Sequence, residues 1–157
     1  MTSHPKRILL VCSGNTCRSP LAAALLAVRL AATADLTDVI VESAGTGARD
    51  GEPASEGSTA VALEHGVDLA AHRSRLISAE MVQHADLILA MSSAHLRRVV
   101  ALGGAGKAQL LTAFAGESGS DVADPFGGDL ATYRNTARQL DRLLASVVSR
   151  LHGPVKP

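Results

Sequence analysis

The sequence predicts an α/β fold, a four-stranded parallel sheet with helices on both faces, in a single domain spanning residues 1–157. Short, nearly continuous apolar runs alternate along the chain with stretches of helical periodicity, and such runs are typical of strands buried on both faces. Strands that alternate with helices are joined by right-handed crossovers and therefore lie parallel. The length of 157 residues suits one domain with a substantial core, and no repeat or linker divides it.

Four apolar runs are the predicted strands. The first three are residues 8–12, 39–44 and 85–91, in which apolar side chains follow one another almost without interruption. The fourth run, residues 108–112, is less apolar and is the weaker candidate. Ligands of open parallel sheets bind beyond the carboxyl ends of the strands, where the strand order reverses, and the first such end is Cys12.

Helical stretches fill the intervals between these runs. We predict helices over residues 20–32, over about 54–65 with Gly66 as the stop, and over about 92–102 before a Gly-Gly pair. The C-terminal segment is the clearest, because its apolar residues recur at alternating steps of three and four and form one stripe that packs on a flat surface. This stripe consists of Leu130, Tyr133, Ala137, Leu140, Leu144, Val147 and Leu151.

The composition argues against several classes of function. Fifteen basic residues balance fifteen acidic ones, so no net field draws the protein to nucleic acid or to anionic lipid. Two cysteines in one short loop cannot form a disulfide framework and indicate a reducing compartment. The N-terminal apolar stretch is too short for a signal-peptide core, and no run of about 18 apolar residues is present. We therefore expect a cytoplasmic protein that binds neither nucleic acid nor membrane; the sequence leaves the oligomeric state open, with a monomer favoured.

Aromatic residues are few: Phe114, Phe126 and Tyr133, with no tryptophan. This scarcity argues against functions that need stacking platforms, such as the binding of single-stranded nucleic acid.

The loop between the first predicted strand and the first predicted helix carries the most specific chemistry. Residues 12–20 read CSGNTCRSP. Successive N–H groups in such a turn, together with the dipole of the following helix, form a cradle for an oxyanion. Gly14 supplies backbone freedom there, and Asn15 tolerates a left-handed conformation.

Two side chains turn this cradle into a candidate reaction site. Cys12 ends the strand, and the local field favours its thiolate, which is the nucleophilic form of cysteine. Arg18 carries a planar guanidinium that matches two phosphate oxygens. Ser19 followed by Pro20 predicts the helix start, with the serine as N-cap. The C-x5-R-S pattern after a strand thus predicts a phosphoryl-transfer site, without the lysine of a nucleotide-binding P-loop.

Simpler interpretations of this loop exist. Those for Cys12 and for a metal site are disfavoured, and that for Cys17 stays open. Cys12 alone would read as a small buried residue that ends a strand, but its neighbours disfavour that interpretation. The two cysteines find no second pair elsewhere, so we expect no metal and no cofactor. Cys17 either traps oxidised Cys12 as a reversible disulfide or is a buried structural residue. The predicted phosphate-binding residues are Ser13, Gly14, Asn15, Thr16, Cys17, Arg18 and Ser19.

A glycine-rich segment supplies the acid that hydrolysis needs. Residues 113–129 read AFAGESGSDVADPFGGD, a composition typical of a mobile functional loop. It offers Asp121 and Asp124. Asp124 precedes Pro125, which favours an extended conformation, and general acid–base catalysis requires a carboxylate in a defined position. An Asp-Pro alone is usually a turn; combined with the cysteine loop, Asp124 is the predicted acid.

Taken together, these motifs resemble the low-molecular-weight protein tyrosine phosphatase family. V-C-x-G-N-x-C-R-S-P at residues 11–20, S-A-G-T at 43–46 and D-P at 124–125 carry the similarity, which covers nearly the whole chain. The resemblance implies a four-stranded parallel sheet and a two-step reaction through phosphocysteine. Cys12 would be the nucleophile and Asp124 the proton donor to the leaving group.

The resemblance also implies supporting roles. Arg18 would clamp the phosphate, and Ser19 would stabilise the thiolate by hydrogen bonding. Asn15, Ser43 and His72 would form the polar network that holds the loop in shape. For His72 an ordinary surface or core histidine is an equally good interpretation.

Departures from the tyrosine-specific pattern concern the walls of the site. Thr16 stands where those enzymes usually carry a bulky aliphatic residue, and Ala48 and Arg49 follow S-A-G-T-G where related sequences often have tryptophan. A single Phe126 and then two glycines replace an aromatic pair. A phenol ring thus loses stacking partners worth about 0.5–1.5 kcal/mol each.

These departures resemble the protein arginine phosphatase branch of the family, which implies phosphoarginine on proteins as substrate. Asp124 would then bind the guanidinium and act on the leaving nitrogen, while the Thr16 hydroxyl orients the attacking water. Thr16 and Phe126 are thus the predicted specificity residues, although Thr16 also reads as a tolerated surface substitution.

Two other functions stay open, a phosphotyrosine or generalist phosphatase of the same family and an inactive phosphate-binding module. A thioredoxin-coupled arsenate reductase needs further cysteines to relay a disulfide, and none follows Cys17.

Overall fold

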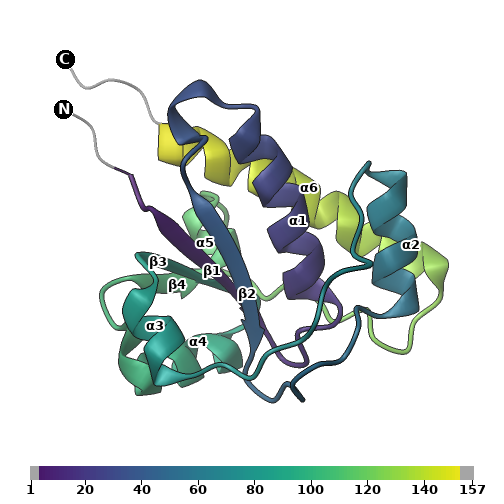
Figure 1. The fold of residues 1–157 in the computed structure, drawn as a ribbon, viewed down its shortest axis with the longest axis horizontal. Coiled ribbons are helices and arrows are strands. Elements are labelled where there is room, and N and C mark those ends of the chain that lie inside the picture. Colours follow the sequence, from purple (N-terminus) through teal and green to yellow (C-terminus); the bar gives the residue numbers. More distant parts are fainter. Residues whose placement is uncertain (1–3, 153–157) are drawn as a thin grey trace.

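The computed structural model describes residues 4–152 and contains a parallel sheet of four strands in the order β2-β1-β3-β4 (Figure 1). All neighbouring strands pair in parallel. The central strands β1 and β3 are buried almost throughout, as their apolar sequences predict. The strands are β1 Arg7–Cys12, β2 Ile40–Gly45, β3 Leu87–Ala90 and β4 Ala108–Leu110.

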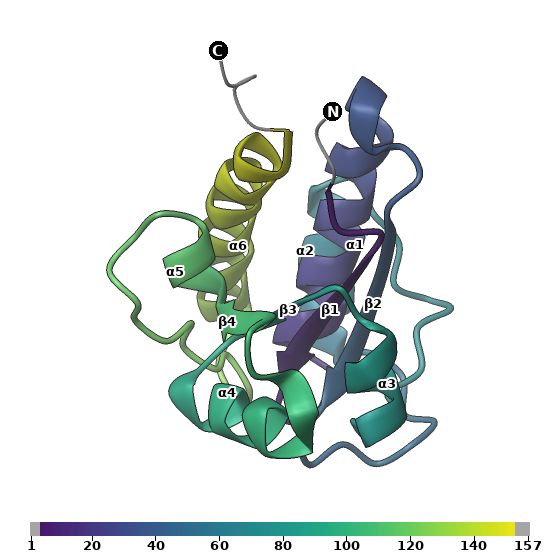
Figure 2. The ribbon, with the colours of Figure 1, turned by 90° about the vertical axis from the view of Figure 1, so that its left-hand side faces the viewer.

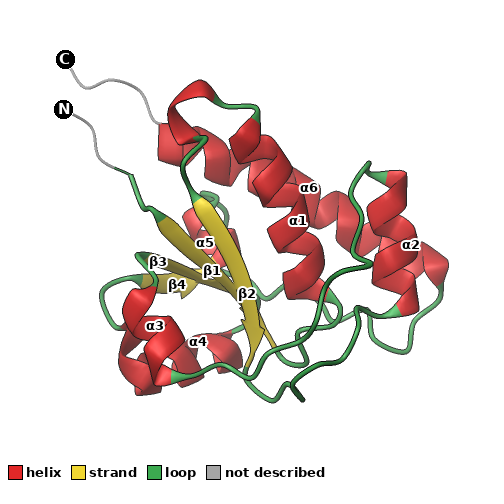
Figure 3. Cartoon of the chain, in the orientation of Figure 1, coloured by secondary structure: helices red, strands yellow, loops and turns green. Residues whose placement is uncertain are grey.

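Helices connect the strands and cover both faces of the sheet (Figure 3). They are α1 Arg18–Ala31, α2 Glu56–Glu64, α3 Ala79–His84, α4 Ser93–Val99, α5 Leu111–Phe114 and α6 Leu130–His152. A 3₁₀ turn, η1 Ala34–Leu36, follows α1, and a π-helical segment, η2 Val100–Gly104, continues α4.

Two hydrophobic cores lie on the two faces of the sheet. Figures 1 and 2 show α1, α2 and α6 on one side of the sheet and α3 and α4 on the other. Alternate residues of β1 point to opposite faces: Ile8 and Leu10 enter the larger core under α1, α2 and α6, whereas Leu9 and Val11 enter the smaller one under α3 and α4. The larger core explains the C-terminal stripe from Tyr133 to Leu151, because α6 packs along α1 with its apolar face, whereas Leu130 is exposed. The predicted four-stranded α/β fold is confirmed.

The strand boundaries differ from the prediction by one or two residues, and the difference at the end of the fourth strand has a physical cause. Residues 111–112 were expected to end the fourth strand, but the strand stops at Leu110 and a short helix begins at Leu111. Leu111 is fully buried in the larger core, and the Thr112 hydroxyl donates a hydrogen bond to the Ser120 carbonyl at 2.5 Å. These tertiary contacts override a weak strand propensity.

The helix predictions hold for the long elements and miss the short ones. Ser55 caps α2, and Gly66 follows it with φ 78°, the left-handed conformation of a glycine stop. Helices α3 and α5 were not predicted, because four to six residues carry no helical period. Among residues 4–152 no helix is both long and apolar enough to cross a membrane.

Candidate active site

The cysteine loop, residues 13–17, lies between β1 and α1 at the carboxyl end of the sheet (Figure 1). A pocket of about 230 Å³ opens beside it. The pocket brings together residues from the loop and from the distant Asp-Pro segment, and it contains all three predicted catalytic side chains. Its lining residues are Cys12, Ser13, Gly14, Thr16, Cys17, Arg18, Asp124 and Phe126.

Asn15 fixes the shape of the loop. It is fully buried and left-handed, with φ 56°. Its amide nitrogen Nδ2 donates to Ser19 Oγ at 2.7 Å and to Ser43 Oγ at 2.9 Å, and its Oδ1 accepts from the Arg75 N–H at 2.9 Å. Because these bonds use every polar group of the amide, they hold a conformation that costs a non-glycine residue about 1 kcal/mol.

His72 supports the same residue from the backbone side. Its Nε2 lies 2.7 Å from the Asn15 carbonyl oxygen, which can only accept, so Nε2 carries the proton. Burial lowers the pKa of His72, and the bond to Asn15 opposes that shift. The contacts that the family resemblance implied for Ser43 and His72 are therefore present.

Gly45, in the S-A-G-T motif, allows β2 to approach the loop closely. A Cβ atom at this position would lie 2.4 Å from the Ser13 carbonyl oxygen and 2.9 Å from the Asn15 nitrogen, so only glycine fits. The following Thr46 and Gly47 N–H groups donate to the carbonyls of Cys12 and Ser13 at 2.9 and 3.0 Å.

Those bonds engage the carbonyl groups of the loop and leave its N–H groups available. Within residues 4–152, no backbone N–H from Ser13 to Cys17 donates to a protein acceptor. Free N–H donors around a pocket at a helix N-terminus are suited to bind an oxyanion.

The Cys12 thiol is 2% exposed and lies 2.9 Å from Ser19 Oγ. Ser19 was predicted to cap α1, and that prediction is wrong. The helix begins at Arg18, and Ser19 lies in its first turn with its hydroxyl directed at Cys12 and Asn15 instead of the helix N–H groups. Pro20 is accordingly the third helical residue, where its missing N–H still costs no intrahelical bond.

Arg18 reaches the pocket with an incomplete set of hydrogen bonds. The residue is 5% exposed, and its Nη1 donates to the Val122 carbonyl oxygen at 2.8 Å. Its Nε is buried and has no partner among the described residues. An unsatisfied buried guanidinium N–H costs about 1–3 kcal/mol or more, and a bound oxyanion would remove that cost.

Asp124 is the acid that reaches the pocket. Its Oδ2 lies 3.5 Å from Arg18 Nη2, and its Oδ1 accepts the Phe126 N–H at 3.1 Å, which fixes the half-exposed carboxylate. Asp121, the other acid considered, instead accepts hydrogen bonds from the N–H and hydroxyl of Ser93 at the start of α4. Phe126 is 75% exposed at the rim of the pocket.

Thr16 and Cys17 also line the pocket. Thr16 is half-buried. Both cysteines are free thiols, and the Cys17 sulfur lies 3.4 Å from each of the Ser55 and Tyr133 hydroxyl oxygens. Burial and the contact with Cys17 raise the pKa of Tyr133.

His95 is a site residue that the sequence did not indicate. It lies on α4, is 4% exposed, and places Nε2 2.7 Å from Ser13 Oγ. Burial and the nearby Arg18 cation lower the pKa of His95 to about 4, so the ring is neutral at pH 7. No sequence signal separates it from the other histidines, because it is 82 residues from Ser13.

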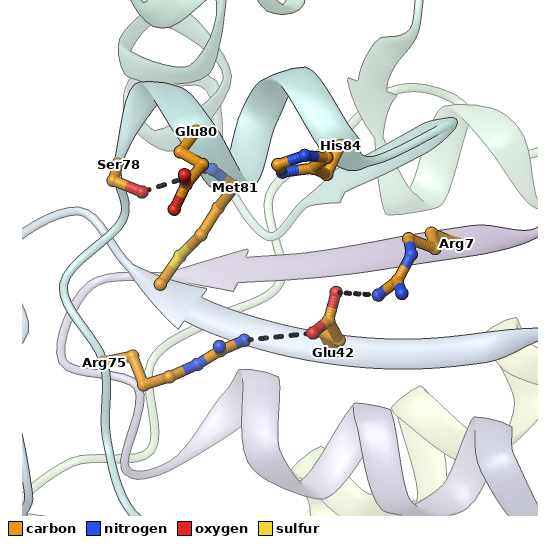
Figure 4. A pocket seen from close by; sticks show the side chains of 7 residues that line it. All are labelled: Arg7, Glu42, Arg75, Ser78, Glu80, Met81 and His84. Carbon is orange, nitrogen blue, oxygen red and sulfur yellow. Dashed lines mark hydrogen bonds and ion pairs between the residues drawn. The ribbon is translucent and has the colours of Figure 1, made fainter.

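A second pocket, of about 300 Å³, lies between β2 and α3 (Figure 4). Arg7 and Arg75 both point at Glu42, with nitrogen–oxygen distances of 3.4 and 3.8 Å. The two arginines and the two glutamates of this pocket, Glu42 and Glu80, balance in formal charge, and its other lining residues, Ser78, Met81 and His84, include no cysteine. The chemistry favours the cysteine pocket as the active site.

Known proteins share both the sequence pattern and the fold. A family model described as low molecular weight phosphotyrosine protein phosphatase matches residues 7–156. The protein-arginine-phosphatase of Geobacillus stearothermophilus is 40% identical over 149 residues, covering 94% of this chain and 97% of that protein. The probable low molecular weight protein-tyrosine-phosphatase EpsP of Ralstonia nicotianae is 34% identical over 158 residues, covering 94% and 97%.

The structural similarity covers about the same share of the chain as the sequence similarity. A mutant of the YwlE arginine phosphatase with a phosphorylated active-site serine superposes with a TM-score of 0.86 at 34% identity, covering 93% of this chain and 95% of that one. With this cysteine loop and this sheet, the chain belongs to the low-molecular-weight phosphotyrosine protein phosphatase family.

Proposed function

We propose that the protein is a protein arginine phosphatase, which hydrolyses phosphoarginine on proteins through a phosphocysteine intermediate. One observation carries the proposal: a buried thiol, a buried guanidinium whose Nε has no partner in the described part of the chain, and a fixed carboxylate meet in one pocket. The names of its relatives, among them an arginine phosphatase with a phosphorylated active-site residue, support it.

In the first step the Cys12 thiolate attacks phosphorus. The sulfur–phosphorus bond forms as the phosphorus–nitrogen bond breaks, and Asp124 donates its proton to the leaving guanidinium nitrogen. The loop N–H groups and Arg18 Nε stabilise the phosphoryl oxygens, where negative charge accumulates.

In the second step water hydrolyses phosphocysteine. Asp124, now a carboxylate, accepts a proton from the water as its oxygen attacks phosphorus, and inorganic phosphate leaves as the sulfur–phosphorus bond breaks. Ser19, 2.9 Å from the sulfur, donates a hydrogen bond to the thiolate that is released. Cys12 thereby returns to its starting state.

The walls of the pocket favour a guanidinium over a phenol. Among residues 4–152, Phe126 is the single aromatic residue that lines it, and Thr16 presents a hydroxyl. A phenol would find few stacking partners, whereas a guanidinium N–H can donate a hydrogen bond to an Asp124 oxygen. Tyrosine phosphatase is the second candidate function, since the family contains both kinds of enzyme by name.

The two free thiols add a proposal on redox behaviour. An oxidant such as hydrogen peroxide would convert the Cys12 thiolate to a sulfenic acid, and condensation with the Cys17 thiol would give a disulfide and release water. A reductant would restore both thiols. We place the reaction in a reducing compartment such as the cytoplasm, because the nucleophile must stay a free thiol.

A side-by-side assay tests the function. Purified enzyme is given phosphoarginine and phosphotyrosine peptides of the same sequence, and kcat/KM is measured for both. We expect the phosphoarginine peptide to be preferred. A preference for phosphotyrosine would favour the second candidate, and release of phosphate from neither would indicate an inactive phosphate-binding module.

A further inference from the structure

His95 connects the pocket to α4 through two hydroxyl groups. Its Nε2 lies 2.7 Å from Ser13 Oγ, and its Nδ1 lies 2.9 Å from Ser92 Oγ. Ser13 lines the cysteine pocket, and its Oγ also lies 3.5 Å from Arg18 Nη2. A ring that is 4% exposed and bonded at both nitrogens has a fixed orientation.

The proton positions of this chain have two consistent arrangements. Arg18 can only donate, so Ser13 Oγ accepts from it in both. In one arrangement Ser92 donates to Nδ1, Nε2–H donates to Ser13, and the Ser13 hydroxyl proton remains for a group in the pocket. In the other, Ser13 gives that proton to Nε2 and turns a lone pair toward the pocket.

An oxyanion in the pocket selects between the two arrangements. Phosphate oxygens that face the loop accept hydrogen bonds, so a Ser13 lone pair directed at them is unfavourable. The Ser13 proton directed at them forms a charge-assisted hydrogen bond. Neutral His95 supplies both a donor and an acceptor and therefore allows the favourable arrangement.

We propose that His95 is a positioning residue, which holds the Ser13 hydroxyl as a donor to the phosphoryl group that the enzyme binds. The inference deepens the proposed function and depends on it for the identity of the anion. Ser13 touches the ligand, and His95 acts through Ser13. The pair thus adds a side-chain donor to the backbone donors of the loop.

A double-mutant cycle on Ser13→Ala and His95→Ala tests the proposal. Vanadate affinity is measured by calorimetry, and kcat and KM are measured with a phosphoarginine peptide. A hydrogen bond to an anionic ligand corresponds to about 10-fold in affinity, and we expect each single variant to lose about that factor. The double variant should lose no more vanadate affinity than either single variant, because both changes remove the same hydrogen bond to the anion.

Three further variants separate positioning from structural damage. His95→Gln keeps an N–H donor and should recover part of the vanadate affinity, whereas His95→Phe, which fills the space without a donor, should not. His84→Ala removes an exposed histidine of the second pocket and should leave all values unchanged. Thermal unfolding of each variant reports whether it folds.

The outcomes are distinct. Normal vanadate affinity in Ser13→Ala, or a double variant that loses the product of both factors, overturns the proposal. If His95→Ala does not fold, Ser13→Ala and His95→Gln still decide it. If the wild-type protein binds vanadate but releases no phosphate from any peptide, the proposed function fails while the binding cycle still tests the role of His95.

Discussion

A histidine contacts the cysteine loop on each of its two sides, and the two histidines bind different groups of the loop. On the β2 side, His72, Ser43 and the Arg75 N–H bind the backbone and amide of Asn15, and every polar group of that amide has a partner. On the α4 side, His95 binds the Ser13 hydroxyl, next to an Arg18 guanidinium whose Nε has none among residues 4–152. The first side sets the shape of the cradle, and the second holds the side-chain donors that we propose for the ligand.

The largest expected effect tests whether anion binding is separate from the nucleophile. Cys12→Ser replaces the thiolate with a poor nucleophile and should lower turnover by at least about 10⁴-fold. The loop N–H groups and Arg18 remain, so phosphate or vanadate binding should stay detectable by calorimetry. Retained turnover would contradict the phosphocysteine mechanism, and loss of anion binding would contradict the separation between cradle and nucleophile.

Asn15→Ala removes the hydrogen-bond network on the β2 side of the loop. This change removes three hydrogen bonds of the buried amide and leaves alanine in a left-handed conformation, so we expect a loss of about 3 kcal/mol in the free energy of unfolding. Denaturant unfolding measures it. Asn135→Ala, an exposed asparagine on α6, is the matched control and should change stability by less than about 0.5 kcal/mol. Equal effects of the two variants would show that the network does not hold the loop.

The two histidines also predict how acid acts on the fold. Both have a pKa below the usual value, His95 at about 4, so the unfolded state binds more protons than the folded state below pH 6.5. Stability from His95 is therefore complete above pH 6.5 and is lost as the pH falls through about 4, by about 3 kcal/mol in all.

Removing each histidine should reduce this acid sensitivity. We expect a flatter dependence of the unfolding free energy on pH, between pH 7 and 4, for His95→Gln than for the wild type, and a smaller flattening for His72→Gln. Chemical denaturation at several pH values measures the slopes. An unchanged slope in His95→Gln would show that this ring is not buried in its neutral form.

The sequence was informative where the chemistry is local. Residues 12–20 contain the proposed nucleophile, the proposed phosphate clamp and the proposed oxyanion cradle in one stretch, so their pattern predicts the loop without knowledge of the fold. Asp124 is distant, but its Asp-Pro motif marks it. The sheet was equally predictable, because strands buried on both faces leave unbroken apolar runs such as 8–12.

Contacts between residues that the strand order brings together could not be predicted from the sequence. Ser13 meets His95 because β3 lies beside β1 and α4 begins just beyond its end, and nothing in the two local sequences records this pairing. The wrong assignment of Ser19 as a helix cap has the same cause. A serine before proline indicates a helix cap, but the side chain turns to Cys12 and Asn15, partners that the fold supplies.

Thr16 follows Asn15, whose conformation is fixed by the contacts on the β2 side. Substitutions of Thr16 should have the smallest effect of those predicted here, and they test substrate choice most directly. Thr16→Ile removes a hydroxyl from the pocket and adds apolar surface, so phosphoarginine turnover should fall and phosphotyrosine turnover rise, each by about 10-fold. Thr16→Val keeps the branched shape without the hydroxyl. If the hydroxyl orients the attacking water, valine should lower phosphoarginine turnover almost as much as isoleucine does; if bulk decides, valine should behave like the wild type. Ratios of kcat/KM for the two peptides measure the preference, and an unchanged ratio in both variants would remove Thr16 from the specificity determinants.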